Sequence, residues 1–281
     1  MIPEMSRRGF LAAVGSTAAV AAIPAAAFAA IPQQERAISP LVVSSDLYAS
    51  PEPQRVAFAV AVGKRYASFT DAQVAFGPPG VTEGTVVDTR LYKKGLPRGR
   101  GVYVAHATFP TPGAWNALLL TRGRRIPFAV QVKDAPEAPT IGTQAPQSPS
   151  PTAAATLGVK PICTRAPQCP LHDQPLDQLI GTGTPVAVMF ATPALCQTAY
   201  CGPVLDQLLD LQDQYAERVR FHHVEIYRSN RGADVAPTVA AWGLPSEPWI
   251  YTIDGDGIIR GRLDGAFGSE EIAANLDALV R

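Results

Sequence analysis

Residues 185–203 read PVAVMFATPALCQTAYCGP, and this stretch decides the fold of the C-terminal half of the chain. Its first part, Pro185–Phe190, is a continuous apolar run, which is typical of a strand covered on both faces of a sheet. Pro203 suits the first position of a helix, where a backbone N–H would have no partner in any case. Apolar residues then recur at helical spacing, at Val204, Leu208, Leu211 and Tyr215. The stretch therefore predicts a central strand, a loop with two cysteines and a helix.

Strands and helices alternate downstream of this stretch. Apolar periodicity and turn residues predict the remaining elements. In chain order they are a strand over 219–227, a short helix over about 236–242, a hairpin of strands 248–254 and 258–263, and a helix that begins after Ser269. The predicted order from residue 185 is therefore β-α-β-α-β-β-α.

Cys196 and Cys201 lie between the central strand and its helix, with four residues between them. Together with the Gly202-Pro203 that follows and with Pro248 ahead of the hairpin, this element order resembles the thioredoxin fold over residues 172–281. The resemblance implies that Pro248 is a cis proline lying against the active-site cysteines. It also implies thiol–disulfide exchange, with Cys196 and Cys201 as the catalytic pair.

The sequence departs from the family at Val204, where thioredoxins carry the second cysteine of Cys-Gly-Pro-Cys. Residues five apart on an α-helix differ by about 140° in direction, so Cys196 and Cys201 can bridge only if the helix begins near Gly202. Cys201 would then precede a helix N-terminus, whose free N–H groups stabilise a thiolate. Counting from the end of the strand instead places Cys196 where the family's nucleophile is found. The sequence leaves the nucleophile open.

Two further cysteines, Cys163 and Cys169, stand close together among prolines. For an exported chain they predict a structural disulfide, although four cysteines allow three pairings. With His172 they could instead bind copper or zinc, but the spacing matches no common zinc pattern and no fourth ligand is evident. Another alternative is that this pair passes electrons to the first pair. His222 and His223 are neighbours on a strand and point to opposite faces, so the sequence predicts no metal site and no cofactor.

The N-terminus resembles an export signal. Arg7 and Arg8 precede an alanine-rich apolar run that ends in Ala27-Phe28-Ala29, as in a signal peptide with a small-x-small cleavage site. Residues 6–11 resemble the twin-arginine signal, which implies export of a folded protein. We therefore expect residues 1–29 to be a twin-arginine signal peptide, cleaved or retained as an anchor. The mature protein is expected in the cell envelope or secreted, with no stable membrane span after cleavage.

Residues 38–133 predict an all-β sandwich. Val56, Phe58, Val60 and Val62 alternate with small residues, and short strands separated by turns follow. The stretch 101–115 loosely resembles the immunoglobulin-like domains of exported bacterial proteins. Residues 134–171 are predicted to be a Pro-rich linker, extended and mobile, because prolines among small residues bury little apolar surface.

The composition narrows the function. The 281 residues are enough for two domains, and 24 basic against 24 acidic residues give no net charge, which argues against a nucleic-acid-binding protein. Neither a phosphate-binding loop nor a Gly-x-Ser-x-Gly elbow is present. The sequence thus predicts an exported thiol–disulfide oxidoreductase that acts on the thiols and disulfides of exported proteins. The alternatives are a non-catalytic thioredoxin-like binding module with structural disulfides, and a copper-handling protein similar to the copper chaperones of cytochrome oxidase assembly.

Overall fold

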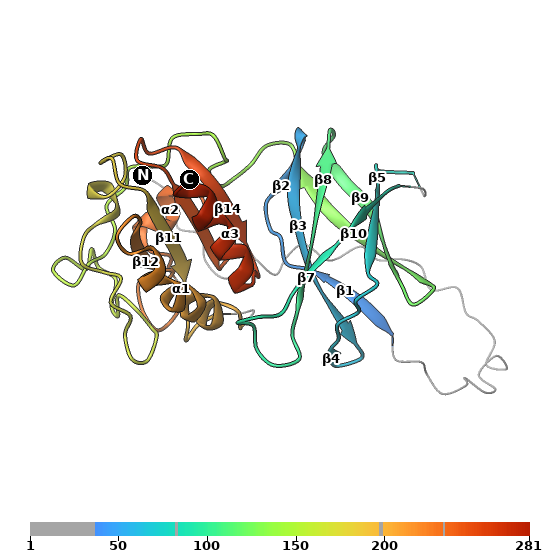
Figure 1. Cartoon of the computed structure of the whole chain (residues 1–281), viewed down its shortest axis with the longest axis horizontal. Helices are drawn as coiled ribbons and strands as arrows, with labels where there is room; N and C mark the ends of the chain where they lie inside the picture. The colour runs from blue at the N-terminus through green and yellow to red at the C-terminus, as the bar shows by residue number, and fades with distance from the viewer. Residues whose placement is uncertain (1–36, 82–83, 197–198, 233) are drawn as a thin grey trace. The chain divides into compact units, whose positions relative to one another are not determined.

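A computed structural model describes residues 37–81, 84–196, 199–232 and 234–281 (Figure 1). The predicted signal peptide, residues 1–29, lies outside these ranges. None of the helices within them is long and apolar enough to cross a membrane. The chain from Ile38 to Arg281 holds together as one unit.

Two five-stranded sheets make up the N-terminal portion of this unit, as expected for a sandwich. One sheet has the order β1-β3-β8-β7 with β4 paired to β3, and the other has the order β2-β10-β9-β5-β6. The strands are β1 (Ile38–Val42), β2 (Leu47–Tyr48), β3 (Ser50–Val62), β4 (Arg65–Tyr66), β5 (Gln73–Gly77), β6 (Thr85–Asp88), β7 (Arg90–Tyr92), β8 (Val102–Phe109), β9 (Gly113–Thr121) and β10 (Arg124–Lys133). The two sheets share one apolar core, to which Phe58 and Trp115 contribute. The immunoglobulin-like identity stays a prediction.

The C-terminal portion has the predicted element order. Its four-stranded sheet has the order β12-β11-β13-β14, with β11 parallel to β12 and antiparallel to β13. The elements are η3 (Leu176–Gln178), β11 (Val186–Ala191), α1 (Cys201–Tyr215), β12 (Arg220–Glu225), α2 (Pro237–Ala241), β13 (Trp249–Ile253), β14 (Ile259–Asp264) and α3 (Ser269–Leu279). The sheet and its flanking helices have the order β-α-β-α-β-β-α that the sequence predicts.

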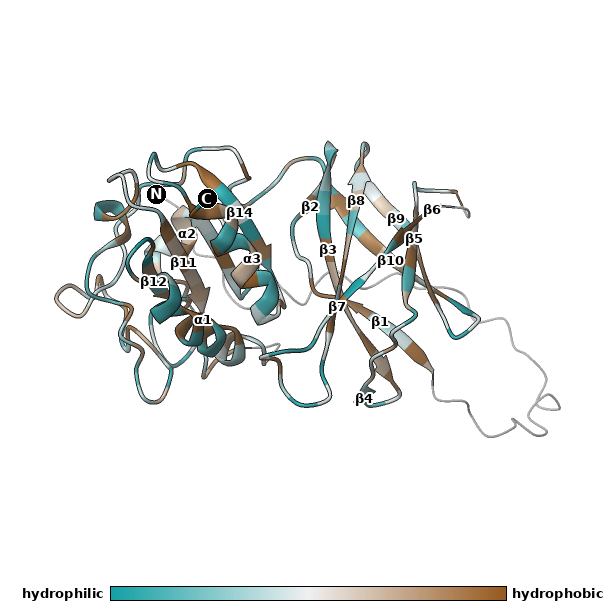
Figure 2. Cartoon of the chain, viewed as in Figure 1, coloured by the Kyte–Doolittle hydropathy of each residue, from teal (hydrophilic) through white to brown (hydrophobic). Residues whose placement is uncertain are grey.

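Strand β11 lies between β12 and β13 in the sheet, and every residue in it is buried. Val188 and Phe190 face the core that contains Trp242, next to α2. Ala187 and Met189 face the opposite core, which is shared by α1 and α3. Figure 2 shows β11 as a hydrophobic strand between these helices. The continuous apolar run therefore reflects two covered faces, as predicted.

The predicted linker is packed rather than mobile. Segment 134–171 is extended and almost without regular secondary structure, as expected, but Ala138, Ala145 and Val159 are buried in the core beside α2. Its backbone also pairs with the sheet region, as when the Lys160 N–H donates to the Arg228 carbonyl at 2.8 Å. Small side chains allow such close approach of backbones, and prolines lower the entropy that is lost on ordering. The expectation of mobility was therefore wrong, because composition alone does not show these contacts.

Buried ion pairs connect the two portions. Arg55 of β3 donates to both carboxylate oxygens of Glu271 in α3, at 2.6 and 2.9 Å. Asp46 accepts from Lys133 at 3.0 Å and from Arg262 of β14 at 2.5 Å. Burial alone would raise the pKa of Asp46, but its hydrogen bonds and these cations lower it on balance. Since Arg55 and Glu271 are both buried, removal of either one would leave an uncompensated charge. The division into two domains stays a prediction.

Candidate active site

The two cysteines of the opening stretch lie at the junction of β11 and α1. Strand β11 ends at Ala191, and α1 begins at Cys201, within one residue of the predicted start. Cys196 lies in the loop between them and is half-buried, whereas Cys201 is fully buried. The pair is thus placed in a loop and at the first residue of a helix, as its bridging requires.

Cys196 faces the start of α1. Its sulfur accepts a hydrogen bond from the backbone N–H of Cys201, at 3.3 Å. The N–H groups of a first helical turn have no partners within the helix, and they carry the positive end of its dipole. Negative charge on the Cys196 sulfur is therefore stabilised by this helix end.

Cys201 is in a contrasting environment. Burial raises the pKa of its thiol well above the ordinary value, and a hydrogen bond with Cys196 and the negative charge of Cys196 raise it further. The sequence had placed the stabilising effect of the helix N-terminus on Cys201. In the structure that effect acts on Cys196, because Cys201 is itself the first helical residue and is turned into the core formed with Val204 and Leu205.

Pro248 lies at the same end of the sheet as the cysteine loop. Its peptide bond with Glu247 is cis, as the resemblance implied. Trp249, the next residue, pairs with Phe190 of β11, so Pro248 lies beside the end of β11 that leads into the loop. The charge of Glu247 is among the smaller causes that raise the pKa of Cys201. The Glu247–Pro248 turn is therefore close enough to Cys201 for the Glu247 charge to act on its thiol.

The N-terminal portion also contacts this site. Tyr200, which immediately precedes Cys201, is buried against Ala57 and Val102. The Arg100 guanidinium lies 5.4 Å from the centre of the Tyr200 ring, and the Gln207 side chain of α1 donates to the Gly95 carbonyl at 2.9 Å. The connection between β7 and β8 thus covers the first turns of α1, a role for the sandwich that no sequence pattern indicated.

The other two cysteines form a second cluster. The sulfur atoms of Cys163 and Cys169 are 3.8 Å apart, much farther than the roughly 2.05 Å of a disulfide bond. Both thiols are free in this structure, and the predicted disulfide stays a prediction. His172 joins them, as one alternative had it, and so does His223, which sequence reasoning did not connect to this group. His222 points away and bonds to the Ser150 hydroxyl at 2.7 Å, so the two histidines do face opposite sides of β12.

The chain is similar to several solved structures. No family model matches the chain, and no curated protein matches it. Among solved structures, a putative thiol:disulfide interchange protein DsbE from Chlorobium tepidum is 15% identical, with a TM-score of 0.38 over 50% of this chain and 99% of its own. A thiol:disulfide interchange protein of the thioredoxin family from Chlorobium tepidum TLS is 16% identical, with a TM-score of 0.35 over 51% and 100%. A thioredoxin-like superfamily protein is 14% identical, with a TM-score of 0.30 over 49% and 97%.

Proposed function

We propose that this protein is an exported thiol–disulfide oxidoreductase in which Cys196 is the attacking thiol and Cys201 the resolving thiol. The observation that carries the proposal is the asymmetry of the pair. Cys196 is half-buried and accepts an N–H from the start of α1, while Cys201 is fully buried with a raised pKa. An accessible cysteine whose sulfur accepts an N–H from a helix start, next to a buried cysteine, is an arrangement that suits exchange.

The chemistry follows from these environments. The Cys196 thiolate attacks one sulfur of a client disulfide, which forms a mixed disulfide and releases the other client sulfur as a thiolate. Cys201 then loses its proton and attacks the Cys196 sulfur. This second step releases the remaining client thiol and leaves a Cys196–Cys201 disulfide, so the client gains two electrons and the protein loses two. The reverse sequence oxidises a client dithiol.

The surroundings support different parts of this cycle. Burial of Cys201 protects the resolving thiol from external oxidants and keeps it next to the mixed disulfide. Pro248, beside the end of β11, contributes the groove in which the client's cysteine region would lie. The Arg100 and Tyr200 pair borders the loop from the sandwich side, so the N-terminal portion would shape which clients can approach. The clients we propose are thiols and disulfides of exported proteins.

Export rests on the sequence. The twin-arginine pattern of residues 6–11 supports translocation of the folded chain, and a compartment outside the cytoplasm is where disulfide chemistry persists. We propose that residues 1–29 are the signal and that the remaining chain acts in the cell envelope or after secretion.

The reduction potential of the Cys196–Cys201 couple tests the proposal. The full chain would be equilibrated in a glutathione or dithiothreitol series, alkylated and examined by mass spectrometry. A couple between roughly −120 and −270 mV is expected of a working exchanger, and its value gives the direction of electron flow. A couple below about −300 mV would mark a structural disulfide and would favour the non-catalytic binding module, which the absence of a cysteine at Val204 also suggests.

A further inference from the structure

Four chemically related side chains meet beneath the loop of the second cysteine pair. Cys163, Cys169, His172 and His223 are all buried, and one sulfur or ring nitrogen from each lies within 4.8 Å of the others. Three of them come from the segment that precedes η3, and His223 comes from the middle of β12. None of the four takes part in the exchange chemistry of Cys196 and Cys201.

The spacing of the four atoms is that of a tetrahedral metal site. The two sulfurs are 3.8 Å apart, the two imidazole nitrogens 3.3 Å, and the Cys169 sulfur lies 3.2 Å from His172 Nε2 and 3.4 Å from His223 Nδ1. Zinc–sulfur bonds of about 2.3 Å and zinc–nitrogen bonds of about 2.0–2.1 Å, arranged as a tetrahedron, require sulfur–sulfur, nitrogen–nitrogen and sulfur–nitrogen distances of about 3.8, 3.3 and 3.5 Å. The measured separations therefore fit one ion at the centre of the cluster.

A backbone carbonyl orients the His223 ring as such groups do around bound metals. His223 Nε2 lies 3.0 Å from the Ala191 carbonyl oxygen, which can only accept a hydrogen bond. The proton of a neutral His223 ring is therefore on Nε2, and the lone pair of Nδ1 is directed into the cluster. Glu225, two residues along the same strand, accepts the backbone N–H of Thr164 at 2.8 Å and so fixes the loop next to Cys163.

We infer that Cys163, Cys169, His172 and His223 form a closed, structural Zn²⁺ site. Two thiolates and two imidazoles are a ligand set that selects zinc over calcium or magnesium, which take oxygen ligands. Four protein ligands in a buried site leave no open position for a substrate, which distinguishes a structural zinc site from a catalytic one. This assignment takes the place of the disulfide that the sequence predicted, because a zinc ion requires both sulfurs as separate thiolates.

The site is connected to the loop that carries Cys196. Ala191, whose carbonyl orients His223, is the last residue of β11 before that loop. Thr164, next to Cys163, accepts the backbone N–H of Ala194 through its hydroxyl at 3.1 Å. The zinc ion thus holds segment 163–172 against the backbone on both sides of Thr192. The functional part of this inference, that zinc positions the attacking cysteine, rests on the proposed function.

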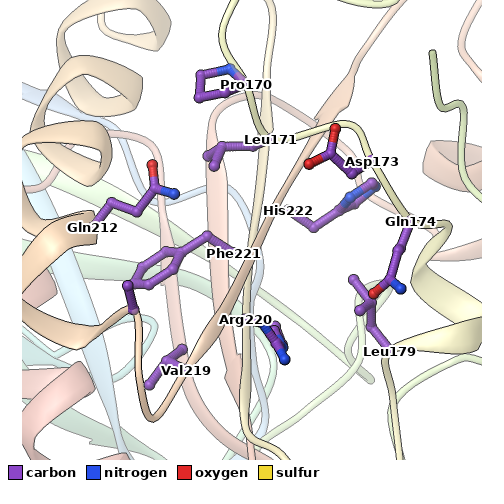
Figure 3. Close-up of a pocket in the computed structure, with 11 residues that line it drawn as sticks. Pro170, Leu171, Asp173, Gln174, Leu179, Gln212, Val219, Arg220, Phe221 and His222 are labelled. Carbon is purple, nitrogen blue, oxygen red and sulfur yellow. The ribbon is translucent and has the colours of Figure 1, made fainter.

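A cavity lies next to the segment that carries His172. It has a volume of about 380 Å³, and Pro170, Leu171 and Asp173 line it on either side of His172 (Figure 3). His222 lines the same cavity from β12. None of the four proposed ligands lines this cavity, so the cluster stays enclosed beside it.

Metal analysis of the full chain tests the inference. The protein would be purified with its thiols reduced, incubated with zinc and desalted before its metal content is measured. We expect one zinc per chain, lost in the double variant Cys163→Ser with Cys169→Ser and in His223→Gln. The matched control is His222→Gln, which removes a buried imidazole from the neighbouring position of the same strand and should keep one zinc. Cys196→Ser should also keep it.

Cobalt provides a second readout that uses the wild-type chain and so does not require any variant to fold. Co²⁺ added to the wild-type chain should give the intense visible absorption of a tetrahedral ion and a thiolate-to-metal charge-transfer band, both displaced by zinc. An octahedral cobalt spectrum would overturn the site, as would an intact mass that shows a Cys163–Cys169 disulfide in chain never exposed to oxidant. Binding of Cu(I) but not Zn²⁺ would overturn the zinc assignment. Zinc binding with an inactive Cys196–Cys201 couple would contradict only the proposed function.

Discussion

The chain contains two cysteine pairs that contact the same apolar core, and their chemistry differs. Cys196 and Cys201 lie at the start of a helix, one half-buried and one fully buried, and the Cys196 sulfur accepts a backbone N–H. Cys163 and Cys169 are both buried, and two imidazoles lie against them. The first pair is asymmetric and suited to exchange, whereas the second is enclosed and suited to a metal. In both pairs the two cysteines are only a few residues apart in the sequence. The comparison therefore shows that the groups around a cysteine, and not its spacing, decide its chemistry.

The largest expected effect separates the two cysteines of the first pair. Cys196→Ser should reduce disulfide exchange to the background rate, because Cys201 is buried and its thiol keeps its proton. Cys201→Ser should still attack and should accumulate mixed disulfides, which non-reducing electrophoresis with mass spectrometry would detect. His222→Gln, a buried substitution outside both cysteine pairs, serves as the control and should leave exchange unchanged. Trapping by Cys196→Ser in place of Cys201→Ser would reverse the assigned roles.

Zinc removal should affect the second pair strongly and the first only indirectly. If zinc binds the folded chain and not the unfolded chain, it stabilises the fold by about 2.7 kcal/mol at a free concentration one hundred times the dissociation constant. A chelator should therefore lower the melting temperature of the wild-type protein, and added zinc should restore it. Differential scanning calorimetry of wild type and of the double variant Cys163→Ser with Cys169→Ser would check this. If zinc changed the melting temperature of neither the wild type nor the double variant, the second pair would not be a metal site, and this difference between the pairs would be refuted.

The protonation of Cys201 predicts a pH dependence. Its raised pKa keeps the thiol neutral in the folded chain at pH values where the unfolded chain already loses the proton. Stability from this group is therefore complete below about pH 8.5, the ordinary thiol pKa, and is lost as the pH rises beyond it.

Because the Cys201 thiol is buried and keeps its proton, iodoacetamide should alkylate Cys196 more than about tenfold faster than Cys201 near pH 7. Mass spectrometry of peptides from a time course measures both rates, and equal rates would contradict the assignment of the attacking thiol.

The smallest expected effect concerns the sandwich side of the first pair. Arg100→Ala removes a cation–π contact with Tyr200 and another with Tyr66, at 5.4 and 4.8 Å. Such contacts contribute about 0.5–1 kcal/mol each near a surface, so urea denaturation should show a loss of about 1–2 kcal/mol for the two. Zinc content should not change. Arg90→Ala, which removes a similar contact with Tyr92 at 5.0 Å, is the matched control for an effect of this kind away from the cysteine loop.

Much of the fold could be predicted from the sequence because its signals are local. The apolar run of β11, the hairpin turn over residues 254–257 and Pro203 at the start of α1 each act within a few residues. The loop position of Cys196 followed from the same local rule. The predicted order of strands and helices was confirmed for these reasons.

The parts that could not be predicted depend on contacts between distant segments. Period-two alternation showed that His222 and His223 face opposite sides, but not which side segment 163–172 covers. His223 therefore escaped notice as the fourth member of the cluster. Likewise, a composition rich in proline and alanine is shared by free linkers and by packed extended segments, and only the partner surface distinguishes them. The sequence offered one signal that polar groups gather on this side: His223 and Glu225, two residues apart on a strand, share one face.

One contact of the packed segment has a consequence for the solubility of the protein. Strand β12 is at the end of its sheet, where unpaired backbone groups can act as a template for strands of other molecules. The backbone N–H of His223 donates to the Leu171 carbonyl at 2.9 Å, so the segment that carries Cys169 and His172 occupies this edge. Release of the segment would uncover a strand with a continuous buried face. By holding this segment in place, the cysteine–histidine cluster thus protects the edge of β12 from aggregation, next to the loop that carries Cys196.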